Sequence, residues 1–291
     1  MSYTKMRPLV GIDAVVIEHS VYQGQELITF VIKAPKFLDA EIEKHRMFSS
    51  NSTSDRAIPF DRMKDAEFFI PRDIRKNQKG MQGFEQVDER TKDSYRRGVR
   101  ELRNEIIDTL SLYPEVHKQH SNRYLLPWAY QTKIITTNND WFNYFEALRD
   151  HPAADPAIQE LAKKMREAYT WSQPKVLEHG EWHLPFVTDE EKDNFSDVEL
   201  CKMSSARCAR ISYNNHDGTD NSFDKDNSLF TMLYEENHRT PMEHQATTMK
   251  ELHANRFGEL EEWEKGVTHM DRWARLYSGN FSGFIQYRQL L

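Results

Sequence analysis

Hydrophobic and polar positions near the start of the chain predict two β-strands. Residues 9–18 and 26–33 are rich in valine, isoleucine and phenylalanine, and Gln23-Gly24-Gln25 lies between them as a turn. The two segments therefore predict a β-hairpin. Ala34-Pro35 ends the second strand, and residues 36–48 are predicted as a helix that leads into a polar run.

Further along the chain, apolar residues recur at the spacing of a helix. The clearest example runs from Asp88 to Leu112, where an apolar stripe alternates with charged residues until Pro114 stops it. The same criterion predicts helices over residues 123–149, 157–170, 197–211 and 225–237, and a long amphipathic helix over 249–277. No change of composition marks a boundary, so we expect one domain over residues 1–248 and a helical C-terminal extension, 249–291, packed on it.

Length and charge narrow the classes of protein that fit. The 291 residues, 38% of them hydrophobic, can bury a sizeable core. A formal net charge of -7 argues against a nucleic-acid polymer as partner, because such binding needs a basic stripe. A mononucleotide needs only a local basic pocket and stays open. The glycine-rich motifs GxGxxG and GxxxxGK[ST] do not occur.

The remaining composition favours a reduced, cytoplasmic setting. Cys201 and Cys208 are too few for a disulfide framework or a four-thiolate zinc site, and we interpret them as buried structural thiols. The first eight residues lack the apolar core of a signal peptide. No stretch approaches the ~18 apolar residues that a membrane span needs.

The strongest chemical signal lies in residues 44–56. Lys44-His45-Arg46 opens it, six consecutive small polar residues fill positions 49–54, and Arg56 follows. Such a run cannot build a core. It offers hydroxyls, an amide and fixed positive charge, which suit a phosphorylated, oxygen-rich ligand. A solvated helix end followed by a serine-rich loop is the alternative. Ser54 as a nucleophile with His45 as its base lacks a supporting aspartate or a nucleophile elbow.

A second cluster spans Asn237 to His244. One interpretation is structural: Thr240 as N-cap, Pro241 at the first helical position and Glu243 as the reciprocal partner of a capping box. The other is functional, because the N-terminus of a capped helix attracts an anion or an electron-rich ring. Both can hold. The two histidines of this cluster are six residues apart with a proline between them, unlike HExxH, so we expect no metal.

Taken together, these segments resemble the flavin-dependent thymidylate synthases. The signature of that family is Arg-His-Arg, seven residues, then Ser, and here Lys44-His45-Arg46 is followed after seven residues by Ser54. The segments 31–37, 68–71 and 123–127 are similar to the strand before the signature, to the segment after it and to the "R-x-x-L-P" helix start. Asn138 and Arg149 fall close to later flavin and nucleotide positions. Residues 209–213 and 238–244 resemble "ARxSY" and "HxTPxEH".

The order of these segments differs from that of the family. There, "ARxSY" and "HxTPxEH" precede the signature strand, whereas here they follow everything else. The chain therefore resembles a circular permutation, which a fold tolerates when its termini lie close together. The tail after His244 has no counterpart, and its end, residues 280–288, is interpreted as packing, with an added ligand contact as the alternative.

Several residues depart from the family pattern. Lys44 replaces the first signature arginine and loses its planar fork. Glu41 stands where the family usually has glutamine, Ser52 where it has glutamate, and Ala57 where it often has tyrosine. Asp140 falls where a flavin-contacting arginine is expected. These changes surround the expected position of the pyrimidine.

The resemblance implies an α/β (α+β) fold with a central antiparallel sheet packed by helices, assembled as a homotetramer with shared sites. It implies methylation of dUMP to dTMP, with FAD as cofactor and methylenetetrahydrofolate and NADPH as co-substrates. The implied catalytic residues are Arg149, which polarises the pyrimidine carbonyl, and Ser54. FAD would be held by Lys44, His45, Arg46, Asn51, Asn138, Ser212, His238, Thr240 and Glu243. The nucleotide would be held by Glu41, Arg46, Ser52, Thr53, Ser54, Arg56, Arg123 and Arg149.

Two alternatives remain at this stage. A relative could hydroxymethylate dUMP or dCMP, with water instead of hydride ending the reaction, and the residues at Glu41 and Ser52 motivate it. The other alternative is a non-catalytic scaffold that retains nucleotide binding.

Overall fold

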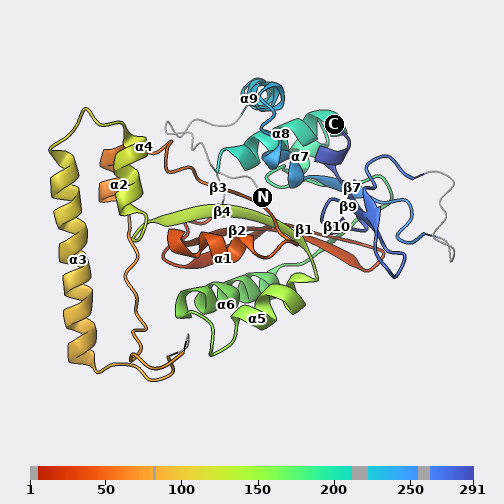
Figure 1. Ribbon diagram of the computed structural model, residues 1–291. Helices are drawn as coiled ribbons and strands as arrows, with labels where there is room; N and C mark the ends of the chain where they lie inside the picture. The colour runs from red at the N-terminus through yellow and green to blue at the C-terminus, as the bar shows by residue number, and fades with distance from the viewer. Residues whose placement is uncertain (1–5, 81–82, 212–221, 255–262) are drawn as a thin grey trace.

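A five-stranded sheet forms the centre of the protein (Figure 1). The computed structural model describes residues 6–80, 83–211, 222–254 and 263–291. The strand order is β3-β4-β2-β1-β5, with bounds β1 Asp13–Tyr22, β2 Gln25–Pro35, β3 Ser49–Ser52, β4 Tyr130–Asn138 and β5 Lys175–Val176. All neighbouring strands are antiparallel except β1 and the short β5.

The predicted hairpin is confirmed as β1 and β2, although β1 starts and ends later than expected. Gln23 and Gly24 form its turn with positive φ angles of 47° and 78°, the backbone that two-residue hairpin loops require. Alternate side chains of β2 point to opposite faces. Phe30 packs in one core with Trp141 and Phe145, whereas Val31 packs in another with Phe186.

One face of the sheet is covered by five short or medium helices: η2 Lys36–Leu38, α1 Asp39–Glu43, η4 Phe142–Glu146, α5 Ala147–Arg149 and α6 Pro156–Trp171 (Figure 1). Helix α6 confirms the prediction for 157–170. Asp155 caps it by accepting from the Ala157 N–H at 2.8 Å. Its apolar stripe, which includes Ile158, Leu161 and Met165, packs on the sheet.

The opposite face carries α7 Asp189–Lys192, α8 Asp197–Ala209, α9 Phe223–Glu235 and η5 Thr240–Glu243. Helices α8 and α9 confirm the predictions for 197–211 and 225–237 within the described residues. They are tied together by buried charge, because Asp226 accepts from Arg207 Nε at 2.9 Å and pairs with Arg210. Arg207 also binds Glu191 at 2.6 Å.

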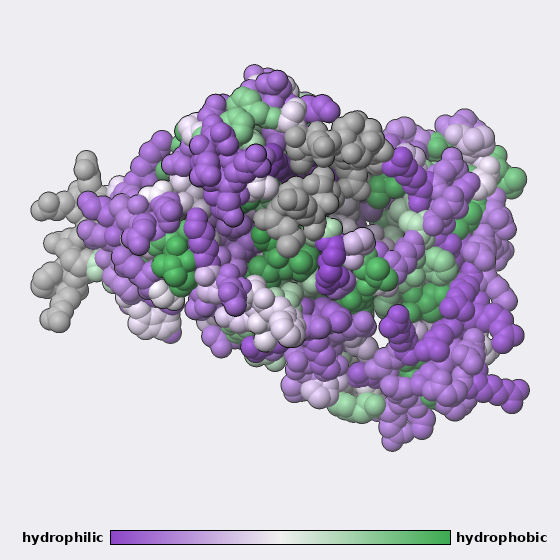
Figure 2. Space-filling model, turned by 180° about the vertical axis from the view of Figure 1, so that it is seen from behind, coloured by the Kyte–Doolittle hydropathy of each residue, from purple (hydrophilic) through white to green (hydrophobic). Residues whose placement is uncertain are grey.

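An arm stands beside the sheet, formed by α2 Phe60–Asp65, α3 Glu89–Ser111, α4 Lys118–Ser121 and η3 Asn122–Leu125 (Figure 1). Helix α3 confirms the prediction for Asp88 to Leu112, and Asp88 caps it. Two residues of its apolar side are exposed, Tyr95 at 52% and Leu102 at 51%, whereas Ile106 and Ile107 pack against the core around Met63 and Leu125. Seen from behind, the surface is mostly hydrophilic, and hydrophobic residues gather across the middle of this face (Figure 2).

The C-terminal part is built from short strands, so the predicted helix over 249–277 is wrong in its described residues. The strands of this part are β7 Ala246–Thr248, β8 His269–Met270, β9 Leu276–Ser278, β10 Phe281–Ser282 and β11 Phe284–Gln286, followed by η6 Tyr287–Gln289. Strand β6 Trp182–His183, from earlier in the chain, pairs with β7. These strands form two sheets, β10-β9-β8 and β11-β7-β6. Since β11 pairs with β7, the tail joins a sheet that begins before residue 249, and the domain boundary at 248 stays a prediction.

Two further helix predictions need correction. Residues 123–149 contain the central strand β4, and only their two ends are helical, in η3 and in η4 with α5. Strand β4 is buried on both faces, so its apolar run Ile134-Ile135 lacks the alternation that marks a half-buried strand. The helix expected over 36–48 ends at Glu43 in the structure.

Candidate functional site

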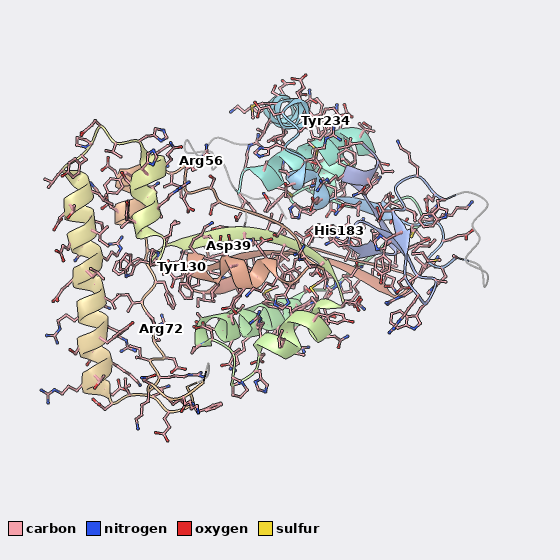
Figure 3. All side chains as sticks on the ribbon, in the orientation of Figure 1. Asp39, Arg56, Arg72, Tyr130, His183 and Tyr234 are labelled. Atoms are coloured by element: carbon pink, nitrogen blue, oxygen red, sulfur yellow. The ribbon has the colours of Figure 1, made fainter. Side chains whose placement is uncertain are left out.

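The signature segment joins helix α1 to the edge strand β3. Lys133 of β4 fixes α1 to the sheet: it is 1% exposed, lies 2.7 Å from Asp39 and also pairs with Glu43. Burial raises the pKa of Asp39, but the hydrogen bond and charge of Lys133 outweigh it and hold that pKa below its usual value. Figure 3 shows Asp39 at the start of α1, alongside the sheet. Lys44 to Phe48 then turn into β3.

The small polar run is a strand and not a loop. Ser49 to Ser52 pair with Thr136 to Lys133 of β4, which leaves β3 at the edge of the sheet. Alternate residues therefore face opposite ways. Ser49 and Asn51 are buried, whereas Ser50 and Ser52 are half-exposed. The strand thus places Ser52, and Ser54 just beyond it, toward solvent.

Residues before β3 line a cavity of about 730 Å³, here called the Arg149 cavity. Its lining comes from three segments: the end of α1, the turn and helices around η4 and α5, and the C-terminal strands. The lining residues are Lys44, His45, Arg46, Met47, Asp140, Tyr144, Leu148, Arg149, His269, Tyr277, Gly279 and Asn280. The last four belong to the tail, and sequence reasoning missed His269 and Tyr277.

Arg149 is the best-positioned cation of this cavity. Its Nη1 donates to Glu41 Oε2 at 2.7 Å, and its Nε donates to His45 Nε2 at 3.1 Å. Burial and then the charge of Arg149 lower the pKa of His45, so the imidazole is neutral at pH 7 and can accept this bond. The third nitrogen, Nη2, makes no hydrogen bond with a described residue and stays available for a ligand.

Residues after β3 line a second depression, here called the Ser54 cleft. It consists of two adjoining cavities of about 600 and 330 Å³ that share Ser52, Ser54 and Arg56. The first also contains His238, Thr240 and Pro241, and the second Arg123 and Thr53. Figure 3 places Arg56 in the segment that leaves β3 toward the arm. Hydroxyls and two arginines from distant segments therefore converge on one cleft.

The structure separates the predicted site residues into these two groups. Lys44, His45, Arg46 and Arg149 line the Arg149 cavity. Ser52, Thr53, Ser54, Arg56, Arg123, His238 and Thr240 line the Ser54 cleft. The two residues expected to be catalytic, Arg149 and Ser54, thus line different depressions of one chain.

Three predicted cofactor residues have structural partners. Asn51 is buried, and although it reaches the rim of the cleft, its Nδ2 donates to the Cys208 carbonyl at 2.9 Å. Asn138 exchanges hydrogen bonds of 2.9 and 3.0 Å with the backbone of Ser282 and also donates to Glu26 O, so its amide joins β4 to the tail. Glu243 pairs with Arg288. Ser212 lies outside the described residues.

The predicted capping box at Thr240 is wrong. Residues Thr240–Glu243 form one 3-10 turn whose N-cap is Arg239, without a side-chain cap. The carboxylate of Glu243 instead pairs with Arg288. A single turn presents little helix dipole. The contribution of this segment to the cleft is therefore its side chains, His238 and Thr240.

A buried chain of hydrogen bonds fixes this segment to the sheet. His244 Nδ1 lies 2.9 Å from Thr136 Oγ1, which lies 2.8 Å from Thr29 Oγ1. Thr29 in turn lies 2.7 Å from His183 Nε2, and His183 Nδ1 lies 2.8 Å from Ser20 Oγ. Burial lowers the pKa of His244 to about 3 and lowers that of His183 as well, so both rings are neutral. The sequence feature that could have indicated this chain of hydrogen bonds is a threonine within each of two apolar strands, Thr29 in β2 and Thr136 in β4.

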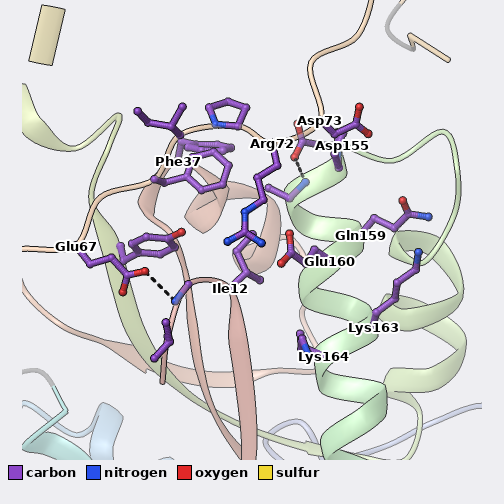
Figure 4. A pocket seen from close by; sticks show the side chains of 18 residues that line it. Ile12, Phe37, Glu67, Arg72, Asp73, Asp155, Gln159, Glu160, Lys163 and Lys164 are labelled. Carbon is purple, nitrogen blue, oxygen red and sulfur yellow. Dashed lines mark hydrogen bonds between the residues drawn. The ribbon is translucent and has the colours of Figure 1, made fainter. Parts of the chain in front are cut away.

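Another cavity, of about 490 Å³, lies between the segment before β1, residues 67–73 and the start of α6 (Figure 4). Arg72 reaches into it. Glu67 on its rim accepts from the Gly11 N–H at 3.0 Å and pairs with Lys33 at 2.5 Å. Burial and the charges of Glu67 and Glu160 raise the pKa of Tyr130 to about 12, so its hydroxyl is neutral. None of its lining residues carries a role in the resemblance.

Other chemistries find little support among the described residues. Cys201 and Cys208 are both free and buried, as expected, and burial raises the pKa of both thiols. Within the described ranges, no cluster of three or more histidine, cysteine or acidic side chains could hold a metal ion. None of the described helices is long and apolar enough to cross a bilayer.

The fold and these depressions define an α+β protein that presents cations and hydroxyls at the edge of an antiparallel sheet. The chain belongs to the family described as thymidylate synthase complementing protein, whose model matches residues 15–174, more than half of its length. It is therefore an enzyme, which removes the scaffold alternative. A search of the curated proteins finds no match.

Solved structures give weaker likenesses. A UMP/dUMP methylase PolB from Streptomyces cacaoi, bound with 5-Br UMP, is 16% identical, with 55% of this chain and 88% of that chain covered and a TM-score of 0.46. The flavin dependent thymidylate synthase ThyX from Helicobacter pylori, complexed with FAD and dUMP, is 19% identical, with 49% and 67% covered and a TM-score of 0.32. The family assignment rests on the matched stretch 15–174 alone.

Proposed function

We propose that the protein methylates dUMP to dTMP with FAD as cofactor, methylenetetrahydrofolate as carbon donor and NADPH as reductant. One carbon passes from the folate to C5 of the pyrimidine, and two electrons from NADPH complete its reduction to a methyl group. Membership of the family supports the reaction class. The observation that carries the proposal is the gathering of the signature residues, Arg123 and the His238 segment around β3.

The side chains around the Arg149 cavity fit a flavin dinucleotide. Lys44 and Arg46 bring two cations to its rim for a pyrophosphate. His45 is a neutral ring packed edge-on against Phe145 at 4.9 Å, so its orientation is fixed. When bound, FAD would supply the hydride that completes the methyl group.

The Ser54 cleft fits the nucleotide. Arg56 and Arg123 offer guanidinium groups to the phosphate, and the hydroxyls of Ser52, Thr53 and Ser54 offer donors to phosphate or sugar oxygens. Arg149 would polarise the pyrimidine carbonyl through its Nη2 and make C6 more electrophilic. No cysteine nucleophile is required, which agrees with two buried thiols of raised pKa.

These roles require Arg149 and Ser54 at one base, although they line different depressions of one chain. We therefore propose that each active site combines the Ser54 cleft of one subunit with the Arg149 cavity of another, in a homotetramer. The apolar stripe of α3, uncovered at Tyr95 and Leu102, supports such an assembly. The two reduced thiols suit a cytoplasmic setting.

We also propose that the family order is permuted here. The family match ends at residue 174, and the "ARxSY" and "HxTPxEH" segments lie beyond it. In the fold, His238, Thr240 and Pro241 nevertheless line the same cavity as Ser52 and Ser54. Segments that precede the signature in the family thus reach the same surroundings from the other end of the chain.

The test is a visible absorption spectrum of the purified protein with and without FAD, followed by titration with dUMP and dCMP. A flavin band that one nucleotide perturbs would support the proposal and identify the base. Turnover with folate and NADPH, read by mass spectrometry, would then identify the product. A protein that binds no flavin at any ratio would contradict it.

A second candidate is hydroxymethylation of dCMP, ended by water, and Glu41 favours it. Its carboxylate neutralises part of the Arg149 charge at 2.7 Å, where the family usually has a neutral glutamine. A carboxylate accepts from the N4 amino group of cytosine, whereas uracil presents an acceptor there. A purely methylated product from dUMP would exclude this candidate.

A further inference from the structure

The C-terminal strands form one wall of the Arg149 cavity. In the β8–β9 pair, His269 lies opposite Tyr277. Their rings stack with centroids 5.0 Å apart and an interplanar angle of 11°, and both line the cavity. Arg275 lies 5.8 Å from the Tyr277 ring and is held by Asp271 at 2.7 Å. His269 is the exposed member of this stack, and Tyr277 is half-buried.

This wall is anchored to the signature segment itself. Asn280 Nδ2 donates to the Met47 carbonyl at 2.7 Å, and Ser49 Oγ donates to Asn280 Oδ1 at 3.0 Å. Gln286 closes the connection by donating to Ser49 Oγ at 3.0 Å and to the Glu243 carbonyl at 3.1 Å. A merely packed tail would not need such bonds to the backbone and side chains between Lys44 and β3.

Gly279 allows the tail to approach this closely. It has a φ of 58°, and a Cβ at this position would lie 2.9 Å from Gln286 Oε1. Any other residue would both strain the backbone and push away the glutamine that binds Ser49. The turn between Tyr277 and Asn280 therefore holds the stacked rings at a fixed place relative to Lys44, His45 and Arg46.

The two sides of the cavity have complementary chemistry. The signature side offers the cations Lys44, Arg46 and Arg149, and the tail side offers stacked aromatic rings. We propose that His269 and Tyr277 form a stacking subsite for the flat heteroaromatic ring of a phosphorylated cofactor, whose anionic part meets Lys44 and Arg46. This subsite lies outside the family match at 15–174, and it rests on the proposed function because it takes FAD as the ligand.

Ring-deletion variants test the subsite directly. We expect His269→Ala and Tyr277→Ala each to raise the dissociation constant of FAD about tenfold, the size typical of losing one stacked ring. Tyr277→Phe keeps a ring and should bind like the wild type. Trp273→Ala is the matched control, because Trp273 is a tail aromatic that is 60% exposed and does not line the cavity.

Flavin fluorescence supplies a second readout that a structural role would not move. A ring stacked on His269 and Tyr277 quenches it, so the saturated Tyr277→Ala complex should fluoresce more strongly than the wild-type complex. Thermal unfolding of each variant separates loss of the subsite from loss of the β8–β9 pair, and His269→Ala, at the exposed ring, remains informative if Tyr277→Ala fails to fold.

The outcomes separate this inference from the proposed function. A wild type that binds FAD while both alanine variants match Trp273→Ala in affinity and quenching overturns the subsite and leaves the proposed function standing. If the wild type binds NADPH or folic acid but not FAD, the same variants measured with that probe decide the subsite. A wild type that binds none of the three probes overturns both.

Discussion

Glu41 determines how much positive charge Arg149 can offer a ligand. The carboxylate lies 2.7 Å from Nη1, and the neutral imidazole of His45 accepts from Nε. These two bonds fix the guanidinium plane, which a lysine could not reproduce. They leave one nitrogen for a substrate carbonyl, with its charge partly compensated by Glu41.

Replacing Arg149 should separate binding from chemistry. We expect Arg149→Ala to retain FAD, because Lys44 and Arg46 remain, and to lose about 10²–10³-fold in kcat, the usual cost of removing one group that stabilises developing charge. Flavin absorbance and steady-state rates measure the two effects. Lys163→Ala, an exposed cation of α6, is the control. Full activity of Arg149→Ala would place the polarising group elsewhere.

Replacing Glu41 should change the choice of base. Glu41→Gln removes a charge but keeps the shape, and its amide can donate to the O4 of uracil where the carboxylate can only accept. We expect kcat/KM for dCMP relative to dUMP to fall about tenfold, since one such contact discriminates by ~1–3 kcal/mol. An unchanged ratio would show that Glu41 acts only through Arg149.

At the scale of elements, strand β3 connects the two depressions of the candidate site. Its buried side chains bind the tail and α8, and its exposed side leads into the Ser54 cleft. The turn η5 packs beside it, and Thr240 of this turn and His238 just before it line the cleft. Neither element is long enough to fold alone, so the cleft exists only when β3 has paired with β4 and η5 has packed on β3.

His238 tests this contribution, because it is exposed at the rim of the cleft. His238→Ala should weaken FAD binding roughly three- to tenfold, the scale of one hydrogen bond, without lowering the thermal midpoint. Isothermal titration and thermal unfolding measure the two quantities. Glu236→Ala, an exposed neighbour that does not line the cleft, should change neither. A large loss of stability would instead make His238 a structural residue.

The buried chain from His244 to Ser20 predicts a pH dependence of stability. The pKa of His244 is about 3 in the folded state against 6.5 in its usual range, and that of His183, near His19, Lys192 and His244, is lowered as well. Between pH 6.5 and about 3, the unfolded chain therefore binds protons that the folded chain excludes. Stability is fully present above pH 6.5 and falls as the pH decreases through this window.

Each such histidine adds about 1.4 kcal/mol per pH unit to the slope of the unfolding free energy. We expect His244→Asn, which keeps a partner for Thr136, to reduce that slope by about this amount, measured by urea unfolding between pH 6.5 and 4.5. His179→Asn, at an exposed histidine, should leave the slope unchanged. An unaltered slope in His244→Asn would mean that His244 is protonated at the same pH in both states.

Periodicity predicted helices α3 and α6, whose apolar residues face one side, and the structure confirms them. The hairpin is also confirmed, but its prediction came from the valine, isoleucine and phenylalanine content and the turn at Gln23-Gly24-Gln25, because β2 is buried on both faces. Strand β4 was missed because both of its faces are buried, so its apolar residues run without a period. The tail strands are two or three residues long and carry no period at all. Their pairing depends on contacts with β7 and with Ser49 that are distant in the sequence.

The candidate site was predictable where its chemistry is local. Residues 44–56 stand out because polar and cationic side chains crowd a short stretch. The structural role of Asn138 could not be predicted from the sequence, because its amide binds Ser282, which is 144 residues away along the chain. The pairing of Glu243 with Arg288 could not be distinguished from a capping box, since both patterns place a glutamate at the same position. That His269 and Tyr277 line the Arg149 cavity could be seen only from the three-dimensional path of the tail.

At the scale of the whole molecule, the active site that we propose is shared between subunits, because the Ser54 cleft and the Arg149 cavity are separate depressions of one chain. Arg149 and Ser54 line separate depressions that share no lining residue, whereas their proposed roles place both residues at one bound nucleotide. In the proposed homotetramer, closed symmetry would bring the Ser54 cleft of one copy to the Arg149 cavity of another. The exposed Tyr95 and Leu102 of α3 would supply apolar surface for such an interface.

Complementation between inactive variants tests this arrangement. When Arg149→Ala and Ser54→Ala chains are co-expressed, sites that combine the intact half of each regain activity, and random mixing restores up to about a quarter of the wild-type rate per site. Each variant expressed alone supplies the baseline, and a mixture of Arg149→Ala with the double variant should stay inactive. Recovery in the first mixture requires that the two residues act across an interface. No recovery, with mixed oligomers demonstrated by mass, would place both residues in one chain and would require β3 to move when the nucleotide binds.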